Sequence, residues 1–107
     1  MWKIEYLKAA VADLKKLDHS QRIEVFNKIN RTAENPLPKS EGGYGEPLAN
    51  TNVAQLAGYC KIKLLKLGIR VVYRLEKNED KMRIIVVSAR TDEEVYKIAQ
   101  VRIKKNK

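Results

Sequence analysis

Three consecutive segments in the second half of the chain constrain its fold most strongly. In residues 59–65 and 69–75, apolar side chains occupy every second position, which is typical of strands with one buried face. The third segment, residues 82–89, is mostly apolar, as expected for a central strand. Gly68 and the polar run 76–81 separate the three segments and suit turns. The pattern therefore predicts an antiparallel meander.

Residues 2–6 alternate apolar and charged side chains and predict a short N-terminal strand. Two helices joined by a tight link follow, and we expect them to lie antiparallel and to cover one face of the sheet. Asp18 and Gln21 are spaced as a capping box for the second helix, with Ser20 as a competing cap, and this helix must end before Pro36. The side chains expected to face the core are Leu7, Val11, Leu14 and Leu17 in the first helix, and Ile23, Phe26, Ile29 or Asn30, and Ala33 in the second.

A capping box at Thr91 and Glu94 predicts a C-terminal helix. The apolar side of this helix consists of Val95, Ile98, Ala99 and Ile103. Residues 35–57 form a long Gly- and Pro-rich loop that is either functional or contains a short element, and residues 52–56 could be a helical turn. Its glycine-rich run 42–45 suits a flexible turn. We therefore expect one α+β domain over residues 1–107, with an N-terminal strand and helical hairpin packed on an antiparallel sheet of about four strands, and a C-terminal helix.

Positive charge is concentrated in the second half of the chain. The net charge is +9, and residues 54–107 hold 14 Lys and Arg against 6 Asp and Glu, whereas residues 1–53 hold 8 against 7. General solubility needs net charge but no such asymmetry. The asymmetry favours a polyanionic partner, most often nucleic acid.

The chain has one histidine and one cysteine. This excludes a paired-histidine ribonuclease, a serine or cysteine triad, and a four-ligand zinc site. We expect His19 to be a solvated linker residue and Cys60 to lie in the core. No metal or cofactor is expected. The chain has neither an apolar run of 18 residues nor a secretory signal, so a cytoplasmic protein without membrane contact is expected.

The strand pattern brings several cations together. Lys61 and Lys63 share a strand face because their spacing is two, and Arg70 and Arg74 share a face of the next strand. With a suitable hairpin register, all four project from one side of the sheet. A solvated face is the plain interpretation, but cations with few acids among them repel one another unless an anion binds there. The acidic run 92–94 suits the positive end of the C-terminal helix.

The segments Ala57–Lys63, Gly68–Tyr73, Ser88–Arg90 and Glu94–Tyr96 resemble the RelE toxins of the RelE/ParE superfamily. This resemblance implies the toxin of a type II toxin–antitoxin system. Its activity would be that of a metal-independent endoribonuclease that cleaves mRNA in the ribosomal A site, through attack by a 2′-OH, and so inhibits translation. The implied partners are an acidic antitoxin, the ribosome and mRNA.

Site residues follow from the same resemblance. Lys61 and Lys63 match the two strand lysines, with Lys63 the better candidate general base, and neighbouring cations are expected to lower the pKa of such a lysine. Arg70 matches the arginine that stabilises the transition state. Arg90 matches the assigned general acid, although arginine side chains are poor acids and an electrostatic role is more reasonable. Tyr96 matches the tyrosine that stacks on the substrate base.

Further candidates lie around this set. Some relatives use a glutamate base in a Glu-Pro-Leu element together with a C-terminal histidine. Glu46 stands in such an element here, but the C-terminal histidine is missing, so Glu46 is a secondary candidate. Arg74, Lys66 and Lys97 are candidate RNA-binding residues.

Two other functions stay open at this stage. A ParE-like toxin would share the fold and inhibit DNA gyrase without cleaving RNA. A basic RNA-binding module would bind without catalysis, so that Arg70→Ala would weaken binding but abolish no activity.

Overall fold

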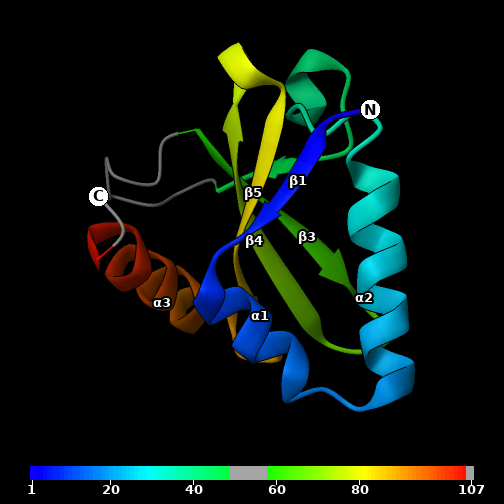
Figure 1. The fold of residues 1–107 in the computed structure, drawn as a ribbon, viewed down its shortest axis with the longest axis vertical. Coiled ribbons are helices and arrows are strands. Elements are labelled where there is room, and N and C mark those ends of the chain that lie inside the picture. Colours follow the sequence, from blue (N-terminus) through cyan, green and yellow to red (C-terminus); the bar gives the residue numbers. More distant parts are fainter. Residues whose placement is uncertain (49–57, 106–107) are drawn as a thin grey trace.

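The computed structural model describes residues 1–48 and 58–105 (Figure 1). Within these residues the strands form one five-stranded sheet in the order β1-β5-β4-β3-β2. The elements are β1 (Lys3–Tyr6), α1 (Lys8–Lys15), α2 (His19–Thr32), the 3-10 turn η1 (Lys39–Glu41), β2 (Glu46–Pro47), β3 (Tyr59–Leu64), β4 (Ile69–Glu76), the 3-10 turn η3 (Lys77–Glu79), β5 (Lys81–Ser88) and α3 (Asp92–Lys105).

The meander predicted from the alternating segments is confirmed, because β3, β4 and β5 pair antiparallel in chain order. The sheet as a whole is mixed rather than antiparallel, since β1 pairs parallel with β5. The two-residue strand β2 was not predicted, and it extends the sheet by pairing antiparallel with Cys60 and Lys61. The postulated turn at 52–56 lies outside the described residues.

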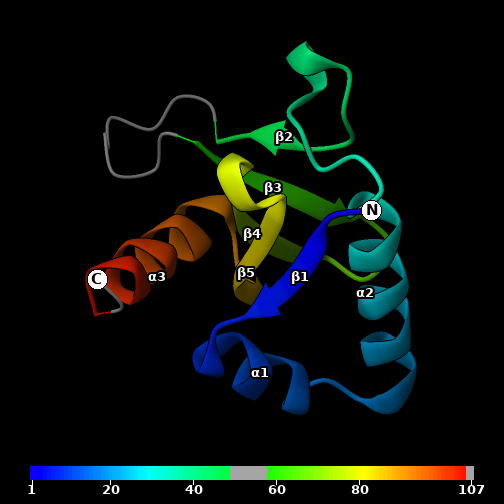
Figure 2. The same ribbon diagram turned by 45° about the horizontal axis from the view of Figure 1, so that its top comes forward.

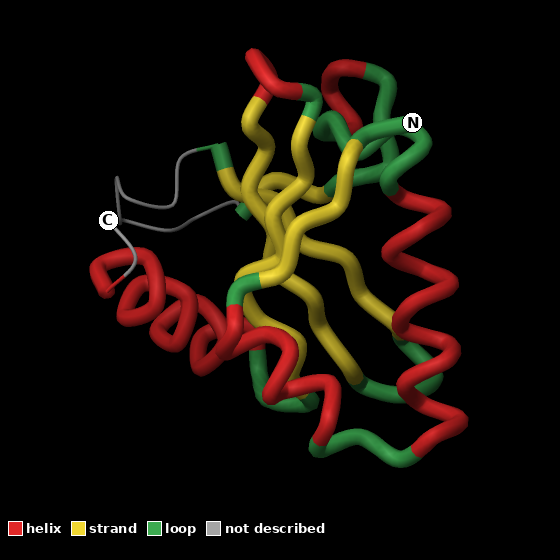
Figure 3. The backbone as a smooth tube through the Cα atoms, viewed as in Figure 1, coloured by secondary structure: helices red, strands yellow, loops and turns green. Residues whose placement is uncertain are grey.

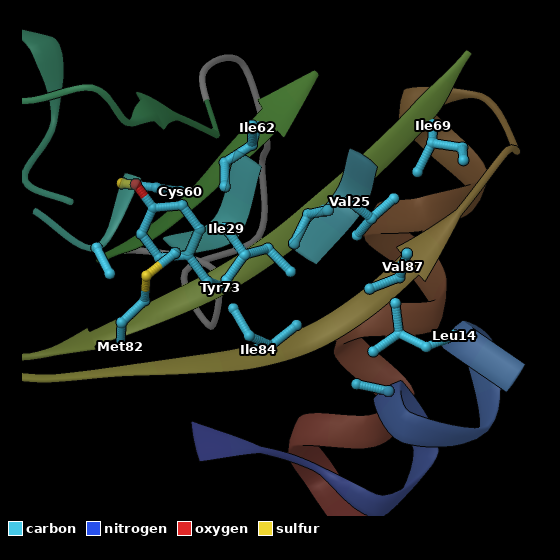
Figure 4. Close-up of a cluster of buried hydrophobic side chains, with 13 residues drawn as sticks. Leu14, Val25, Ile29, Cys60, Ile62, Ile69, Tyr73, Met82, Ile84 and Val87 are labelled. Atoms are coloured by element: carbon cyan, nitrogen blue, oxygen red, sulfur yellow. The ribbon is translucent and has the colours of Figure 1, made fainter. Parts of the chain in front are cut away.

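Helices cover both faces of the sheet. Figures 1 and 2 place α3 on one side, and α1 and α2 on the other. The larger core lies under α1 and α2, where Val25 and Ile29 pack against strand residues such as Tyr73, Met82 and Ile84 (Figure 4). The smaller core lies under α3 and consists of Leu48, Tyr59, Val72, Ile85, Val86, Val95 and Ala99.

A bulge in β5 lets one strand serve both cores. Val72 pairs with Val86, whereas Tyr73 pairs with Ile84, so Ile85 is an extra residue in β5. Ile85 and Val86 therefore both belong to the core under α3, although they are adjacent in the chain.

The caps of α2 and α3 agree with the prediction, and the buried faces of α1 and α2 agree in part, since the predicted Leu14, Ile29 and Ala33 are buried. The Asp18 side chain accepts a hydrogen bond from the Gln21 backbone at 2.9 Å, and His19, at the first position of α2, is exposed as expected. The predicted Val11, Ile23 and Phe26 are exposed; the residues buried in these helices are Ala10, Asp13 and Leu14 in α1, and Val25, Ile29 and Thr32 in α2.

Both helices carry apolar residues around a wide arc, so periodicity alone did not select the inner face. The arrangement of the pair also differs from the expected antiparallel hairpin. In Figure 3 the two helices diverge from their short link instead of lying along each other.

The glycine-rich run expected to be flexible is held by backbone hydrogen bonds. The Tyr44 amide donates to the Asn35 carbonyl at 3.0 Å, and the Lys39 amide donates to the Gly45 carbonyl at 2.8 Å. Gly45 packs so closely that an added Cβ would lie 2.1 Å from the Tyr73 hydroxyl. That hydroxyl, beside Cys60 in Figure 4, donates to the Pro36 carbonyl at 2.7 Å. The core thus fixes the base of this loop.

We expect Tyr73→Phe to lower the free energy of unfolding by about 1 to 3 kcal/mol, because the substitution leaves the Pro36 carbonyl without its donor. Urea unfolding followed by circular dichroism measures this change. Tyr44→Phe is the matched control, since Tyr44 is 56% exposed. Equal stability of the two variants would show that the buried hydrogen bond does not hold the loop.

Candidate active site

The expected row of cations lies on the face of the sheet that α3 partly covers. Cys60 and Ile62 point into the core under α1 and α2, so Lys61 and Lys63 point to the opposite face. Arg70 joins them there because β3 and β4 pair Lys63 with Arg70. The hairpin register that the cation cluster required is therefore present.

Asp92, at the start of α3, lies among these cations. The Lys61 Nζ is 3.2 Å and the Lys63 Nζ 3.6 Å from its Oδ2 atom, and the Arg70 Nε donates to its Oδ1 atom. Arg70 also donates through a terminal nitrogen to the Arg90 carbonyl at 2.7 Å. The anion that compensates the cations in this structure is thus a carboxylate of the chain itself. We call Lys61, Lys63, Arg70 and Asp92 the Asp92 cluster.

Contacts in and beside the Asp92 cluster raise the pKa of Lys61. Burial by itself would lower the pKa of Lys61, but hydrogen bonds to Tyr96 and Asp92 outweigh it, and the pKa lies above its ordinary value. Partial burial likewise would raise the pKa of Asp92, but Lys61 and Arg70 hold it below its ordinary value. The expectation that neighbouring cations lower a lysine pKa is therefore wrong for Lys61, because a carboxylate sits between them.

Tyr96 also contacts the cluster. Its hydroxyl accepts a hydrogen bond from the Lys61 Nζ at 2.8 Å, and its ring packs against the core under α3. Tyr96 lies one turn of helix beyond Asp92, so both reach the same lysine from one side of α3. The structure thus brings Lys61, Lys63, Arg70 and Tyr96 together.

Arg90 and Lys97 do not join them. The Arg90 guanidinium is 3.2 Å from the Glu94 carboxylate, on an exposed surface, and only its backbone carbonyl touches Arg70. Lys97 pairs with Glu93 at 3.5 Å, also exposed. Exposed ion pairs of this kind are weak, so both side chains can reorient at small cost.

The other candidates lie further away. Arg74 contacts the Tyr59 ring at 5.8 Å and stands four residues along β4 from Arg70. Lys66 is exposed in the turn between β3 and β4. Glu46 pairs across the strands with Lys61, but its carboxylate is 3.3 Å from the Lys39 ammonium.

A largely buried ion pair that the sequence did not reveal fixes α3 to the sheet. The Arg102 guanidinium donates to both oxygens of the Asp13 carboxylate, at 2.6 and 3.0 Å. Asp13 also accepts from the Val87 amide at 2.9 Å, and Arg102 donates to the Ile85 carbonyl at 2.9 Å. The pair therefore connects α1, the β5 bulge and α3, and it positions the helix that carries Asp92.

Asp92 is the main site residue that sequence reasoning missed. Its place after Thr91 signalled a helix start, and the Thr91 side chain does accept from the Glu94 amide at 3.3 Å. Only the strand register and the path of α3 bring the carboxylate to the lysines. For Asp13 the available signal was its place among apolar positions of α1.

In the described residues, no three His, Cys, Asp or Glu side chains are grouped to hold a metal ion. In the same part of the chain, no helix combines the length and the apolar character needed to cross a membrane.

The structure is similar to those of known toxins. The isolated RelE toxin of E. coli matches with a TM-score of 0.66 and 22% identity, covering 96% of this chain and 99% of RelE. The E. coli RelBE toxin–antitoxin complex matches at 0.67 and 19%, covering 85% and 99%. The RelBE2 complex of Mycobacterium tuberculosis matches at 0.65 and 21%, covering 83% and 91%. No protein-family model matches the chain, and no curated protein matches it. At these identities the likeness concerns the fold, and this chain has the fold of the RelE toxins.

Proposed function

We propose that this chain is the toxin of a type II toxin–antitoxin system and cleaves mRNA in the ribosomal A site, which would place its action in the cytoplasm. The observation that carries the proposal is the Asp92 cluster, with Tyr96 beside it, in a chain with the RelE fold. An anion already sits among three cations, so the site suits a phosphate group.

The chemistry requires no metal. The 2′-OH next to the scissile phosphate attacks it, a 2′,3′-cyclic phosphate forms, and the 5′-oxygen of the next nucleotide leaves. In the transition state the phosphorane carries extra negative charge. Arg70 presents its guanidinium fork on the sheet face and is suited to stabilise that charge.

A lysine takes the proton of the 2′-OH, and the leaving 5′-oxygen takes a proton from water, with Arg90 supplying positive charge beside it. Lys63 is the proposed base for the 2′-OH, because its contact with Asp92 is longer than that of Lys61. Arg90 would reach the leaving oxygen after releasing Glu94, and its contribution is electrostatic. Tyr96 would stack on a base of the codon. Glu46 is the secondary candidate base.

Such weak proton-transfer groups make positioning of the RNA decisive, and this is consistent with a need for the ribosome. Arg74, Lys66 and Lys97 are proposed to contact RNA phosphates away from the scissile bond, because each is an exposed cation outside the cluster.

An antitoxin is the proposed protein partner. The RelE neighbours include complexes with antitoxin, and the net charge of +9 suits an acidic segment. We expect the antitoxin to wrap the sheet and to displace or support α3. A complex that leaves both α3 and the cation face untouched would contradict this expectation.

The test is translation in vitro of a defined mRNA, with cuts mapped by primer extension. Cuts within A-site codons that require ribosomes are expected from the wild-type chain. If the folded protein makes no cuts, the proposed ribonuclease activity is refuted. If the protein then inhibits the supercoiling activity of purified DNA gyrase, the ParE-like alternative is favoured.

Asp92→Asn tests the role of the internal carboxylate. We expect it to tighten binding of a single-stranded RNA with 2′-O-methyl groups by up to about fivefold, because RNA phosphate no longer competes with a partly exposed ion pair. Fluorescence anisotropy measures the affinity without cleavage.

The control for Asp92→Asn is Glu93→Gln. It removes the same charge from the same helical turn, but Glu93 contacts only Lys97 among the ion pairs of the described residues. Weaker binding by Asp92→Asn would show instead that Asp92 orients the cations for RNA.

A further inference from the structure

A cationic groove runs along the free edge of β3 and ends at the Asp92 cluster. Two cavities of about 340 and 410 Å³ share Lys28, Arg31 and Lys63 in their linings. Lys28 and Arg31 lie one turn apart on the exposed side of α2, and Lys63 lies across from them on β3. The shared residues make the two cavities one continuous groove between helix and strand, which we call the α2–β3 groove.

The cations that line this groove outnumber its carboxylates, Glu24 and Glu46. Among the residues that the structure describes, no carboxylate pairs with Lys28 or Arg31. Glu46 lines the same groove and is paired with Lys39. Glu24 also lines it, one helical turn before Lys28, and forms no ion pair with Lys28 in the described residues. Lys28 and Arg31, beside Lys63, are therefore available to bind an anionic ligand.

Tyr44 adds an aromatic surface to the α2–β3 groove. Its side chain is 56% exposed and lines the same cavity as Lys28 and Arg31. Its backbone is fixed by the hydrogen bond from its amide to the Asn35 carbonyl, so the ring stands on an ordered turn. Cations that follow a groove, together with an exposed aromatic ring, are the features that bind single-stranded nucleic acid.

The groove and the Asp92 cluster meet at the edge of the sheet. Lys61 and Lys63 line the groove as well as holding Asp92. Because β2 pairs only with Cys60 and Lys61, no strand of the described residues covers the edge of β3 beyond them. A chain bound at the cluster can therefore pass over this edge into the groove.

We propose that the α2–β3 groove binds the single-stranded RNA next to the cleaved bond, with Lys28 and Arg31 on phosphates and Tyr44 stacked on a base. This inference rests on the proposed function for the identity of the ligand. An extended acidic peptide would satisfy the same charges and the open strand edge, but an acidic segment offers few flat apolar groups to the Tyr44 ring, whereas every RNA base has a face that stacks on it. RNA is therefore the occupant that the groove fits.

The test uses the full-length protein and a fluorescein-labelled 2′-O-methyl oligoribonucleotide, which binds but cannot be cleaved. The Lys28→Ala/Arg31→Ala variant is expected to bind several-fold more weakly. Its plot of log affinity against log salt should be shallower by about 1.4, since each phosphate contact on a single strand contributes about 0.7. Tyr44→Ala is expected to weaken binding by at least about fivefold, whereas Tyr44→Phe keeps the affinity.

Lys8→Ala/Lys16→Ala is the matched control, because it removes the same charge from exposed positions of α1 and its link that line neither cavity. Circular dichroism checks that each variant is folded. Equal loss in the two double variants, or an unchanged salt slope in Lys28→Ala/Arg31→Ala, would overturn the proposal.

Two further readouts separate this inference from its alternatives. If Lys28→Ala/Arg31→Ala abolishes binding of a poly-glutamate peptide but not of the oligonucleotide, the groove is a peptide site and the proposal is wrong. Because this assay contains no ribosomes and measures no cleavage, a protein that binds RNA through the groove but cuts no mRNA would refute the proposed function alone.

Discussion

Arg70→Ala is expected to lower ribosome-dependent mRNA cleavage by about 10²- to 10³-fold, the loss typical when one preorganised donor to a developing charge is removed. Arg70 is the only guanidinium of the Asp92 cluster, as the structure describes it, and Lys63 lies directly across from it. Arg70→Lys keeps the positive charge but loses the planar guanidinium, so its cleavage rate should fall between those of the wild type and Arg70→Ala. Single-turnover cleavage on stalled ribosomes, with saturating protein, separates this effect from binding.

Arg83→Ala provides a close control for Arg70→Ala. Both arginine side chains are 27% exposed and both pair with carboxylates. Arg83 lies on the same face of the sheet, because its neighbours Met82 and Ile84 point into the other core. Cleavage by Arg83→Ala should stay near the wild-type rate. Equal losses in the two variants would mean that the arginine acts on the fold and not on the phosphate.

Asp13→Ala is expected to lower the free energy of unfolding by about 3 kcal/mol, near the lower end of the range for breaking a buried ion pair. The substitution leaves the Arg102 guanidinium without the carboxylate that accepts its two bonds, and it removes the acceptor of the Val87 amide. Because Arg102 is on α3, the loss should be largest for that helix. Urea unfolding gives the total, and hydrogen exchange of α3 amides shows where protection falls.

The comparison for Asp13→Ala is Glu93→Ala, which breaks an exposed pair with Lys97 on the same helix. An exposed i, i+4 pair stabilises a helix by about 0.5 kcal/mol or less, so this variant should unfold almost as the wild type does. Asp13→Asn keeps an acceptor for the Val87 amide, so its loss of unfolding free energy should fall between those of Asp13→Ala and Glu93→Ala. A loss below about 1 kcal/mol in Asp13→Ala would mean that Arg102 finds another partner and that the pair does not hold α3.

Local patterns determined the elements of this protein and much of its candidate site. Period-two alternation located the first two strands of the meander, and a mostly apolar run located the third. The Asp18 and Thr91 caps located the starts of two helices. The same alternation put Lys61 and Lys63 on one face, because the direction of a side chain along a strand depends only on its position. Within the described part of the chain, these predictions needed no knowledge of distant residues.

Tertiary structure decided which segments meet. The parallel pairing of β1 with β5 and the inner faces of α1 and α2 depend on contacts between residues far apart in the chain. Local secondary-structure propensity does not predict such contacts. Asp92 shows the functional consequence. In the sequence, Asp92 marks only a helix start, yet the path of α3 makes it the counter-anion of the cation cluster. The hydrogen bonds of Lys61 to Tyr96 and to Asp92, both on α3, reverse the expected pKa shift of Lys61. The electrostatic energy between two charges depends on the distance between them, and folding sets that distance for residues far apart in the chain.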